Sequence, residues 1–319
     1  MTASTPDLSV VIPAHRAIGT IARTLESVFA QELVRPEVIV VIDGADLETE
    51  RLVAGYPVQV VVNPVPRGSQ QARNRGLAAV STEYVAFLDS DDYIIGELHH
   101  GMLESLRQAG ADIVFAPWNH DTGNATGHLH RDDLESLASR DSLLVAWAGG
   151  RVSQTGAMAW RTESLRAIGG WDAALTRFQD AEIGFRSIAC GLTHCFSREG
   201  QLVYVLHDSD TRVTARPWDR DRWALDRFFS YMEEVSRHRP HGAAMRAALS
   251  NWAYHLAVQA FRSKNREAGR LLLRIAKRNG ALRLSGSLPT RLATRIIGLE
   301  RKIDFAERIA WLRRGRSRV

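Results

Sequence analysis

The stretch Tyr84-Val-Ala-Phe-Leu-Asp-Ser-Asp-Asp-Tyr93 decides how the rest of the sequence is interpreted. Its first five residues form a short apolar and aromatic run, which is typical of a strand buried on both faces of a parallel sheet. Three carboxylates follow at once, those of Asp89, Asp91 and Asp92. Because like charges repel, this cluster favours a site for a hard divalent cation such as Mg²⁺ or Mn²⁺, which takes oxygen ligands. An acidic turn that caps the next helix is the alternative, although a single cap requires fewer acids.

Similar apolar runs occur before and after this strand and alternate with segments of helical periodicity. They are Leu8–Pro13, Glu37–Ile42, Val58–Val62, Asp112–Ala116, Gly156–Trp160 and Leu202–Leu206. Helices are expected from Ser69 onward, at Gly96–Ala109 and at Gln179–Cys190. This alternation over short connections predicts a mostly parallel, Rossmann-like α/β sheet sandwiched by helices. Such sheets bind ligands at the carboxyl ends of their strands, and Asp43 ends the strand from Glu37.

The pattern of apolar residues changes after Pro217, and from there on every segment has helical periodicity. We therefore predict two regions, a catalytic α/β domain at 1–215 and a helical region at 216–319. The chain carries a net charge of +5, and its basic residues crowd into the part after Arg262. The terminal helix is basic and carries an apolar stripe made up of Leu292, Ile296, Leu299, Ile303, Ala306 and Ala310. It is expected to pack on its own protein, to pair with a second copy in a homodimer, or to lie on a membrane surface.

The composition indicates the class of protein and the compartment in which it is expected to work. A hydrophobic share of 45% and a charged share of 24% are ordinary for a globular protein. The longest apolar runs fall short of the roughly 20 residues that cross a bilayer. The two cysteines, Cys190 and Cys195, are too few for a structural zinc site and fit a reducing compartment. We expect a cytoplasmic protein that is associated, if at all, with the inner face of the membrane.

The order and spacing of several short motifs resemble those of the family 2 glycosyltransferases, an inverting group with the GT-A fold. The resemblance covers about Leu8 to Thr211. Its motifs are Val10-Val-Ile-Pro-Ala14, Asp43-Gly44, Ala72-Arg-Asn-Arg-Gly76, Phe87-Leu-Asp-Ser-Asp-Asp92, Gly169-Gly-Trp-Asp172 and Gln179-Asp180. A glutamate commonly stands in that family where this chain has Gln179.

The resemblance implies a role for each matching position. Pro13 and Ala14 would line the nucleotide pocket, and Asp43 would read the edge of the base. Arg73 would lie near the nucleotide, with Asp89 on its ribose or on the donor sugar. The remaining roles are those of the metal ligands Asp91 and His207, the general base Asp180, and the acceptor-binding turn Gly170, Trp171 and Asp172.

The chemistry of sugar transfer fits these residues. A cation, Mn²⁺ or Mg²⁺, would offset the charge of the departing diphosphate, and a base would take the proton of the acceptor hydroxyl. One base serves a single displacement with inversion. A double displacement needs a further carboxylate nucleophile, for which Glu182 and Asp172 remain open. The ring of Trp171 is expected to stack under the acceptor sugar or, equally, to pack half-buried.

Two other functions compete with sugar transfer. A sugar-nucleotide nucleotidyltransferase would share the sheet and the metal, but Pro13-Ala-His-Arg-Ala17 contains neither the glycine nor the lysine of a phosphate loop. A non-catalytic protein that binds membrane or nucleic acid through its basic helices would have no use for the acidic cluster. We therefore expect a nucleoside-diphosphate-sugar donor, UDP first, and a saccharide or glycolipid acceptor in surface polysaccharide or lipopolysaccharide synthesis, with no nucleic-acid partner.

Overall fold

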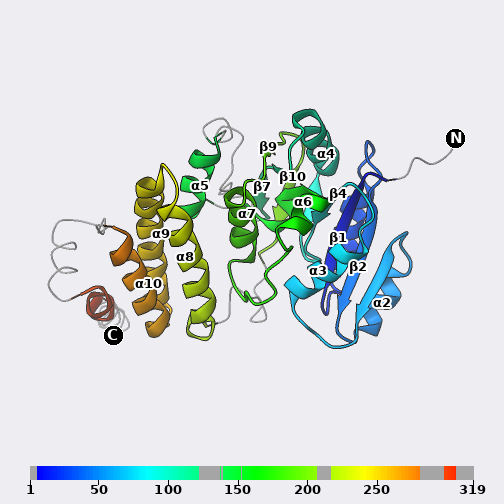
Figure 1. Ribbon diagram of the computed structural model, residues 1–319. Coiled ribbons are helices and arrows are strands. Elements are labelled where there is room, and N and C mark those ends of the chain that lie inside the picture. Colours follow the sequence, from blue (N-terminus) through cyan, green and yellow to red (C-terminus); the bar gives the residue numbers. More distant parts are fainter. Residues whose placement is uncertain are drawn as a thin grey trace, which may run out of the picture. The chain divides into compact units, whose positions relative to one another are not determined.

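The computed structural model describes residues 6–121, 137, 139–151, 153–206, 217–280 and 298–306. The chain divides into two compact units (Figure 1). The first comprises 1–147 with 151–209, and the second comprises 148–150 with 210–319. The predicted boundary at 215/216 lies outside the described residues. In the described part of the chain, no helix is long and apolar enough to span a membrane.

The first unit is built on a seven-stranded sheet of order β3-β2-β1-β4-β8-β6-β9. Its strands are β1 (Leu8–Ala14), β2 (Glu37–Asp43), β3 (Gln59–Asn63), β4 (Tyr84–Phe87), β6 (Ile113–Phe115), β8 (Met158–Arg161) and β9 (His194–Phe196). All neighbours pair in parallel except β8, which is antiparallel to both β4 and β6. The mostly parallel sheet predicted from the sequence is confirmed.

Helices cover both faces of this sheet because the strand side chains alternate. Val10 and Ile12 belong to a core shared with α1 (Ile21–Phe29) and α4 (Leu98–Ala109). Val11 points the other way, toward α3 (Ser69–Ala79), where a Cβ on Gly76 would lie 2.3 Å from a Val11 methyl. The glycine of the Ala72–Gly76 motif therefore allows close packing of α3 on the sheet. The remaining helices of this unit are α2 (Leu47–Val53), α5 (Arg140–Ala148), α6 (Thr162–Ala167) and α7 (Gln179–Ala189), with a 3₁₀ turn at Thr155–Ala157.

A second sheet has only three strands, in the order β5-β10-β7. These are β5 (Tyr93–Ile95), β10 (Gln201–Tyr204) and β7 (Trp118–His120). The strand predicted at Leu202–Leu206 is therefore β10, and it pairs antiparallel with β5 directly after the acidic turn rather than in the large sheet. The excursion predicted at Asn119–Arg131 begins inside β7 and otherwise lies outside the described residues.

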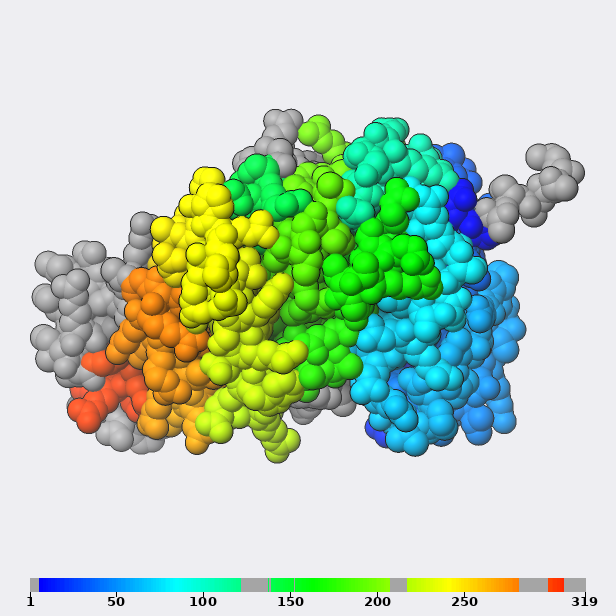
Figure 2. Space-filling view, viewed as in Figure 1, coloured from blue at the N-terminus to red at the C-terminus, as the bar shows by residue number. Residues whose placement is uncertain are grey.

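The second unit is helical, as predicted. It contains a 3₁₀ turn at Trp218–Asp221, the helices α8 (Arg222–Arg237), α9 (Gly242–Arg262) and α10 (Arg266–Asn279), and helical residues 299–306. The outer faces of α8, α9 and α10 adjoin on the surface (Figure 2, yellow-green to orange). Inside, the Glu233 carboxylate accepts hydrogen bonds from Arg278 Nε at 2.6 Å and from Asn279. This buried carboxylate joins α8 to the end of α10. Of the predicted terminal stripe, Leu299 and Ile303 are buried, whereas Ala306 is exposed. The other three residues, Leu292, Ile296 and Ala310, lie outside the described residues.

Candidate active site

The acidic turn, residues 89–92, follows β4 at the carboxyl end of the strand. The Asp92 N–H donates to the Asp89 carbonyl at 3.1 Å and closes the turn. Asp92 is only 2% exposed. The pKa of Asp92 is raised well above its ordinary value. Burial is the largest cause, and the negative charges of Asp89, Asp91 and Asp180 raise the pKa further. Four carboxylates brought together from β4 and α7 therefore act on one another electrostatically.

Arg73 on α3 connects this turn to α7. Its side chain is buried, and Nη2 donates to Asp89 Oδ1 at 2.5 Å. Nη1 donates to Gln179 Oε1 at 3.1 Å, and the guanidinium lies 4.5 Å from the centre of the Trp171 ring. Arg73 was predicted to lie near the nucleotide, and both of its terminal nitrogens are thus held by protein groups. Asp89 is ion-paired with it.

Asp180, the predicted base, lies in the first turn of α7. Thr155, in the 3₁₀ turn before β8, donates its hydroxyl to Asp180 Oδ1. Burial is the largest influence on the Asp180 carboxyl and raises its pKa to about 6, with a smaller increase from Asp89. Arg73 and the Thr155 hydroxyl act in the opposite direction. A carboxyl with this pKa is ionised near neutral pH and still basic enough to accept a proton.

Of the two alternatives for Trp171, the structure favours packing, and the ring is more deeply buried than the half-buried position that was expected. The side chain is 2% exposed, and its ring meets Phe87 and Trp160 edge to face at centroid distances of 5.3 and 6.3 Å. With Arg73 over one face, the indole has no surface left on which an acceptor sugar could stack. The ring instead packs against the end of β4, where it meets Phe87.

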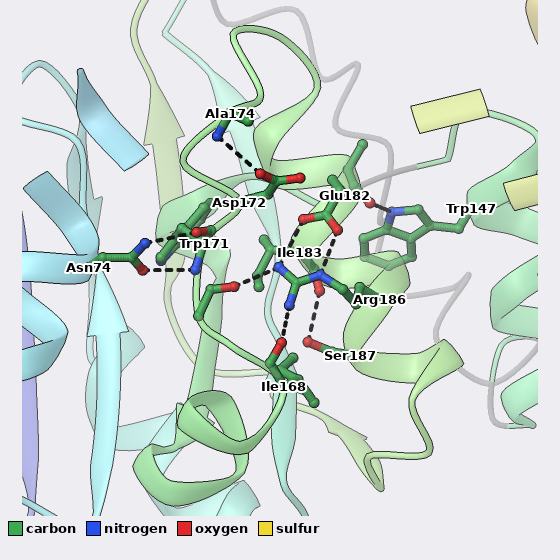
Figure 3. A network of polar contacts seen from close by, with 12 residues as sticks. Asn74, Trp147, Ile168, Trp171, Asp172, Ala174, Glu182, Ile183, Arg186 and Ser187 are labelled. Carbon is green, nitrogen blue, oxygen red and sulfur yellow. Dashed lines mark hydrogen bonds and ion pairs between the residues drawn. The ribbon is translucent and has the colours of Figure 1, made fainter. Parts of the chain in front are cut away.

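Side chains on α3 and α7 form hydrogen bonds with the turn that carries Trp171 (Figure 3). The Asn74 side chain accepts from the Trp171 N–H and donates to the Trp171 carbonyl, both at 2.8 Å. Arg186 donates to the carbonyls of Ile168 and Gly170 at 2.5 and 2.6 Å. Gly169 and Gly170 take φ values of +89° and +63°, which favour glycine.

The two carboxylates left open as nucleophiles have structural contacts. Glu182 is 6% exposed, and both of its oxygens accept from Arg186, at 2.6 and 3.0 Å. Asp172 accepts the Ala174 N–H at 3.0 Å and begins the loop toward α7. The ion pair of Glu182 with Arg186 explains why an acid at this position in α7 is buried.

Asp43 holds the segment that leads from β3 to α3. Its carboxylate accepts from the Asn63 side chain at 3.0 Å, from Arg67 N at 3.0 Å and from Gly68 N at 2.8 Å. Pro13 and Ala14, at the end of β1, are buried beside β2. These contacts of Asp43 were not predictable, because backbone N–H donors leave no signature in residue type. Recognition of the base by Asp43 stays a prediction.

Of the two predicted metal ligands, the structure describes only one. Asp91 is half-buried in the acidic turn, and His207 lies outside the described residues. Within the described ranges, no group of three or more His, Cys, Asp or Glu side chains could hold a metal ion by itself. Metal binding by Asp91 and His207 stays a prediction.

Replacing Asn74 with alanine is expected to lower the free energy of unfolding by about 2 kcal/mol, since two hydrogen bonds of about 1 kcal/mol each are lost. Urea unfolding measures the change. Arg75→Ala, at the exposed next position of the same helix, is the control and should change little. Asn74→Asp keeps the acceptor for Trp171 N but turns a second carboxylate oxygen toward the Trp171 carbonyl, so it should not restore the stability of the wild type. Equal stability of the Asn74 and Arg75 alanine variants would contradict the role of Asn74.

The chain is similar to known proteins in both sequence and fold. Residues 9–169 match the family described as Glycosyl transferase family 2. The succinoglycan biosynthesis protein ExoO of Rhizobium meliloti is 39% identical over 112 residues, which are 34% of this chain and 32% of that protein. The pre-mycofactocin glycosyltransferase of Mycobacterium tuberculosis is 28% identical over 66% of this chain and 44% of its own length. The matched region therefore spans less than half of either relative.

Solved structures share the fold at low sequence identity. TarS of S. aureus, residues 1–349 in complex with UDP-GlcNAc, superposes with a TM-score of 0.58 at 14% identity and covers 88% of this chain and 94% of its own. The mannosyltransferase PcManGT of Pyrobaculum calidifontis, in complex with GDP-Man and Mn²⁺, gives a TM-score of 0.55 at 15% identity, with 95% and 87% covered.

Proposed function

Because the chain belongs to glycosyltransferase family 2, we propose that it transfers a sugar from a nucleoside-diphosphate-sugar to a hydroxyl acceptor, with inversion at the anomeric carbon. The observation that carries the proposal is the placement of Asp180 next to the Arg73–Asp89 pair, with its pKa raised to about 6. An ionised carboxylate beside the end of β4 suits the removal of a proton from the attacking hydroxyl.

The donor would bind at the carboxyl ends of β1, β2 and β4. Pro13 and Ala14 would line the base pocket, and Asp43 would face the base while it holds the segment before α3. Asp89 would contact the ribose or the donor sugar, with Arg73 behind it. UDP is the first choice of nucleotide, since TarS was solved with UDP-GlcNAc; the GDP-Man complex of PcManGT is the reason to test GDP as well.

A divalent cation suits the acidic turn. The carboxylates of Asp89, Asp91, Asp92 and Asp180 repel one another, so a positive charge bound among them would lower their electrostatic free energy. Asp91 would hold the cation, with His207 as a second protein ligand. When bound, the cation supplies charge neutralisation for the leaving diphosphate.

Inversion is favoured by the state of the alternative nucleophiles. The Glu182 carboxylate is tied to Arg186 at both oxygens, and Asp172 accepts a backbone N–H. A covalent intermediate would require one of them to leave these contacts. Asp180 accepts the Thr155 hydroxyl at Oδ1, and as the base in one displacement it would not have to leave an ion pair such as that of Glu182.

The acceptor would be a saccharide or glycolipid of a surface polysaccharide or related conjugate. ExoO is named for succinoglycan biosynthesis, which supports this class. Gly170 and Asp172 would contact the acceptor through the turn that Asn74 and Arg186 hold, with Trp171 as the packing beneath it. The protein would act in the cytoplasm, and the basic helical region at 216–319 would contact the membrane surface or a second copy.

The decisive experiment is a donor screen of the full chain. UDP-, GDP- and dTDP-sugars are supplied with Mn²⁺ or Mg²⁺, and nucleotide release is measured with and without a chelator. We expect slow donor hydrolysis with one nucleotide class, abolished by the chelator. Release of pyrophosphate from a nucleoside triphosphate would instead support a nucleotidyltransferase, and release that ignores the chelator would contradict the metal-assisted mechanism.

A further inference from the structure

Thr24 is a polar residue on the otherwise apolar buried face of α1. The buried neighbours on this helix are Ile21, Leu25 and Val28. Thr24 is 0% exposed. A hydroxyl removed from water is costly unless it is hydrogen-bonded, so its partner indicates why a polar group stands there.

The partner is the acidic turn. Thr24 Oγ1 donates to the Asp92 carbonyl at 2.7 Å, and Arg23 Nη2 donates to the Asp91 carbonyl at 2.9 Å. Two consecutive residues of α1 therefore hold two consecutive carbonyls of the turn. From the other side, Asp92 Oδ1 accepts the N–H of Val205 at 2.9 Å, which ties the turn to the end of β10.

These contacts separate the roles of the neighbouring acids. The side chain of Asp92 is buried and holds Val205, whereas Asp91 is half-buried. Arg23 is exposed, and its guanidinium lies 4.7 Å from the centre of the Tyr93 ring. Of the two residues of α1, only Thr24 is fully enclosed, so its bond to the turn is shielded from water and is the stronger constraint.

We propose that Thr24 is a positioning residue that sets the affinity of the acidic turn for a divalent cation. The inference rests on the proposed function, because it assumes that Asp91 holds the cation that the diphosphate needs. Without the Thr24 hydroxyl, the Asp92 carbonyl is buried without this donor, and the backbone that carries Asp91 gains freedom. That freedom must be lost again when the cation binds, and the affinity falls accordingly.

The test uses three variants of the full chain. Thr24→Val removes the hydroxyl at nearly constant volume, and Thr24→Ser retains it. Thr49→Val makes the same exchange at another fully buried threonine, on α2, whose hydroxyl forms no hydrogen bond in the described part of the chain. Binding of Mn²⁺ in the presence of UDP is measured by calorimetry, and amide hydrogen exchange is followed in the peptide that covers residues 88–94.

In Thr24→Val we expect about a three- to tenfold weaker binding of Mn²⁺ and a similarly faster exchange in that peptide, from the loss of one buried hydrogen bond. Thr24→Ser and Thr49→Val should resemble the wild type in both measurements. Faster exchange with unchanged Mn²⁺ affinity would overturn the inference and leave Thr24 a purely structural residue. Equal effects of the two valine variants would overturn it as well.

Failure of the inference and failure of the proposed function remain distinguishable. If the wild-type protein binds Mn²⁺ with UDP but turns over no sugar donor, the proposed function fails, and the calorimetric comparison still decides the role of Thr24. If it binds no Mn²⁺ with UDP, the inference is overturned, whatever the donor screen shows.

Discussion

Replacing Asp180 with asparagine is expected to lower sugar transfer by about a thousandfold, within the range of about 10²–10⁴ that a positioned general base contributes. The amide keeps the shape of the side chain and an acceptor for the Thr155 hydroxyl but accepts no proton. The rate is measured as nucleotide release in the presence of acceptor. An Asp180→Asn variant with wild-type turnover would exclude Asp180 as the base.

The same substitution is expected to stabilise the protein at alkaline pH. The pKa of Asp180 is raised from 3.8 to about 6 in the folded, metal-free protein, so folding favours the protonated form. The ionised carboxyl costs up to about 3 kcal/mol above pH 6. This cost grows between pH 3.8 and pH 6 and is absent below that window.

Unfolding by urea in the presence of a chelator measures this effect. Asp180→Asn should exceed the wild type in stability at pH 8, and the difference should shrink steadily toward pH 4. Glu163→Gln, on the exposed surface of α6, is the control and should change neither rate nor stability. A stability difference that does not vary with pH would show that the carboxyl titrates alike in the folded and unfolded chains.

Replacing Asp91 with alanine is expected to reduce metal-dependent turnover by about a thousandfold, since a cation that offsets the diphosphate charge contributes several kcal/mol. The wild-type enzyme treated with a chelator should fall to the same level, and the chelator should have no further effect on Asp91→Ala. Such non-additivity is expected when two changes remove one interaction.

Glu104→Gln serves as the control for Asp91→Ala, because it removes an acid from an exposed pair with Arg107 on α4. It should keep the full response to Mn²⁺. An Asp91→Ala variant that responds to Mn²⁺ as the wild type does would show that the cation binds elsewhere.

The large sheet was predictable from the sequence because its buried strands carry continuous apolar runs. β1, β2 and β4 are of this kind, and their burial is complete or nearly so. The small sheet was not predictable as a sheet. β5 and β7 have three residues each, too few for alternation to be visible, and their pairing with β10 joins segments far apart in the sequence.

The candidate site was predictable where function depends on the type of residue and its place at a strand or helix end, as for Asp91 and Asp180. The burial of a side chain was harder to predict from the sequence. An aromatic ring after two glycines could be exposed or enclosed, and the positions of Phe87, Trp160 and Arg73 decide that Trp171 is enclosed. Thr155 and Thr24 lacked any signal, because each acts through a single hydroxyl on a distant partner.

The antiparallel strand β8 has a consequence for how the chain is made. β4 ends at Phe87, but its partner on that side begins only at Met158. While the ribosome is still adding the residues between them, the nascent chain already contains β1 to β4 and leaves one edge of β4 without a neighbour. An apolar strand with a bare edge is prone to pairing with other chains. Translational pauses before Met158 would prolong this exposure and increase the demand on chaperones.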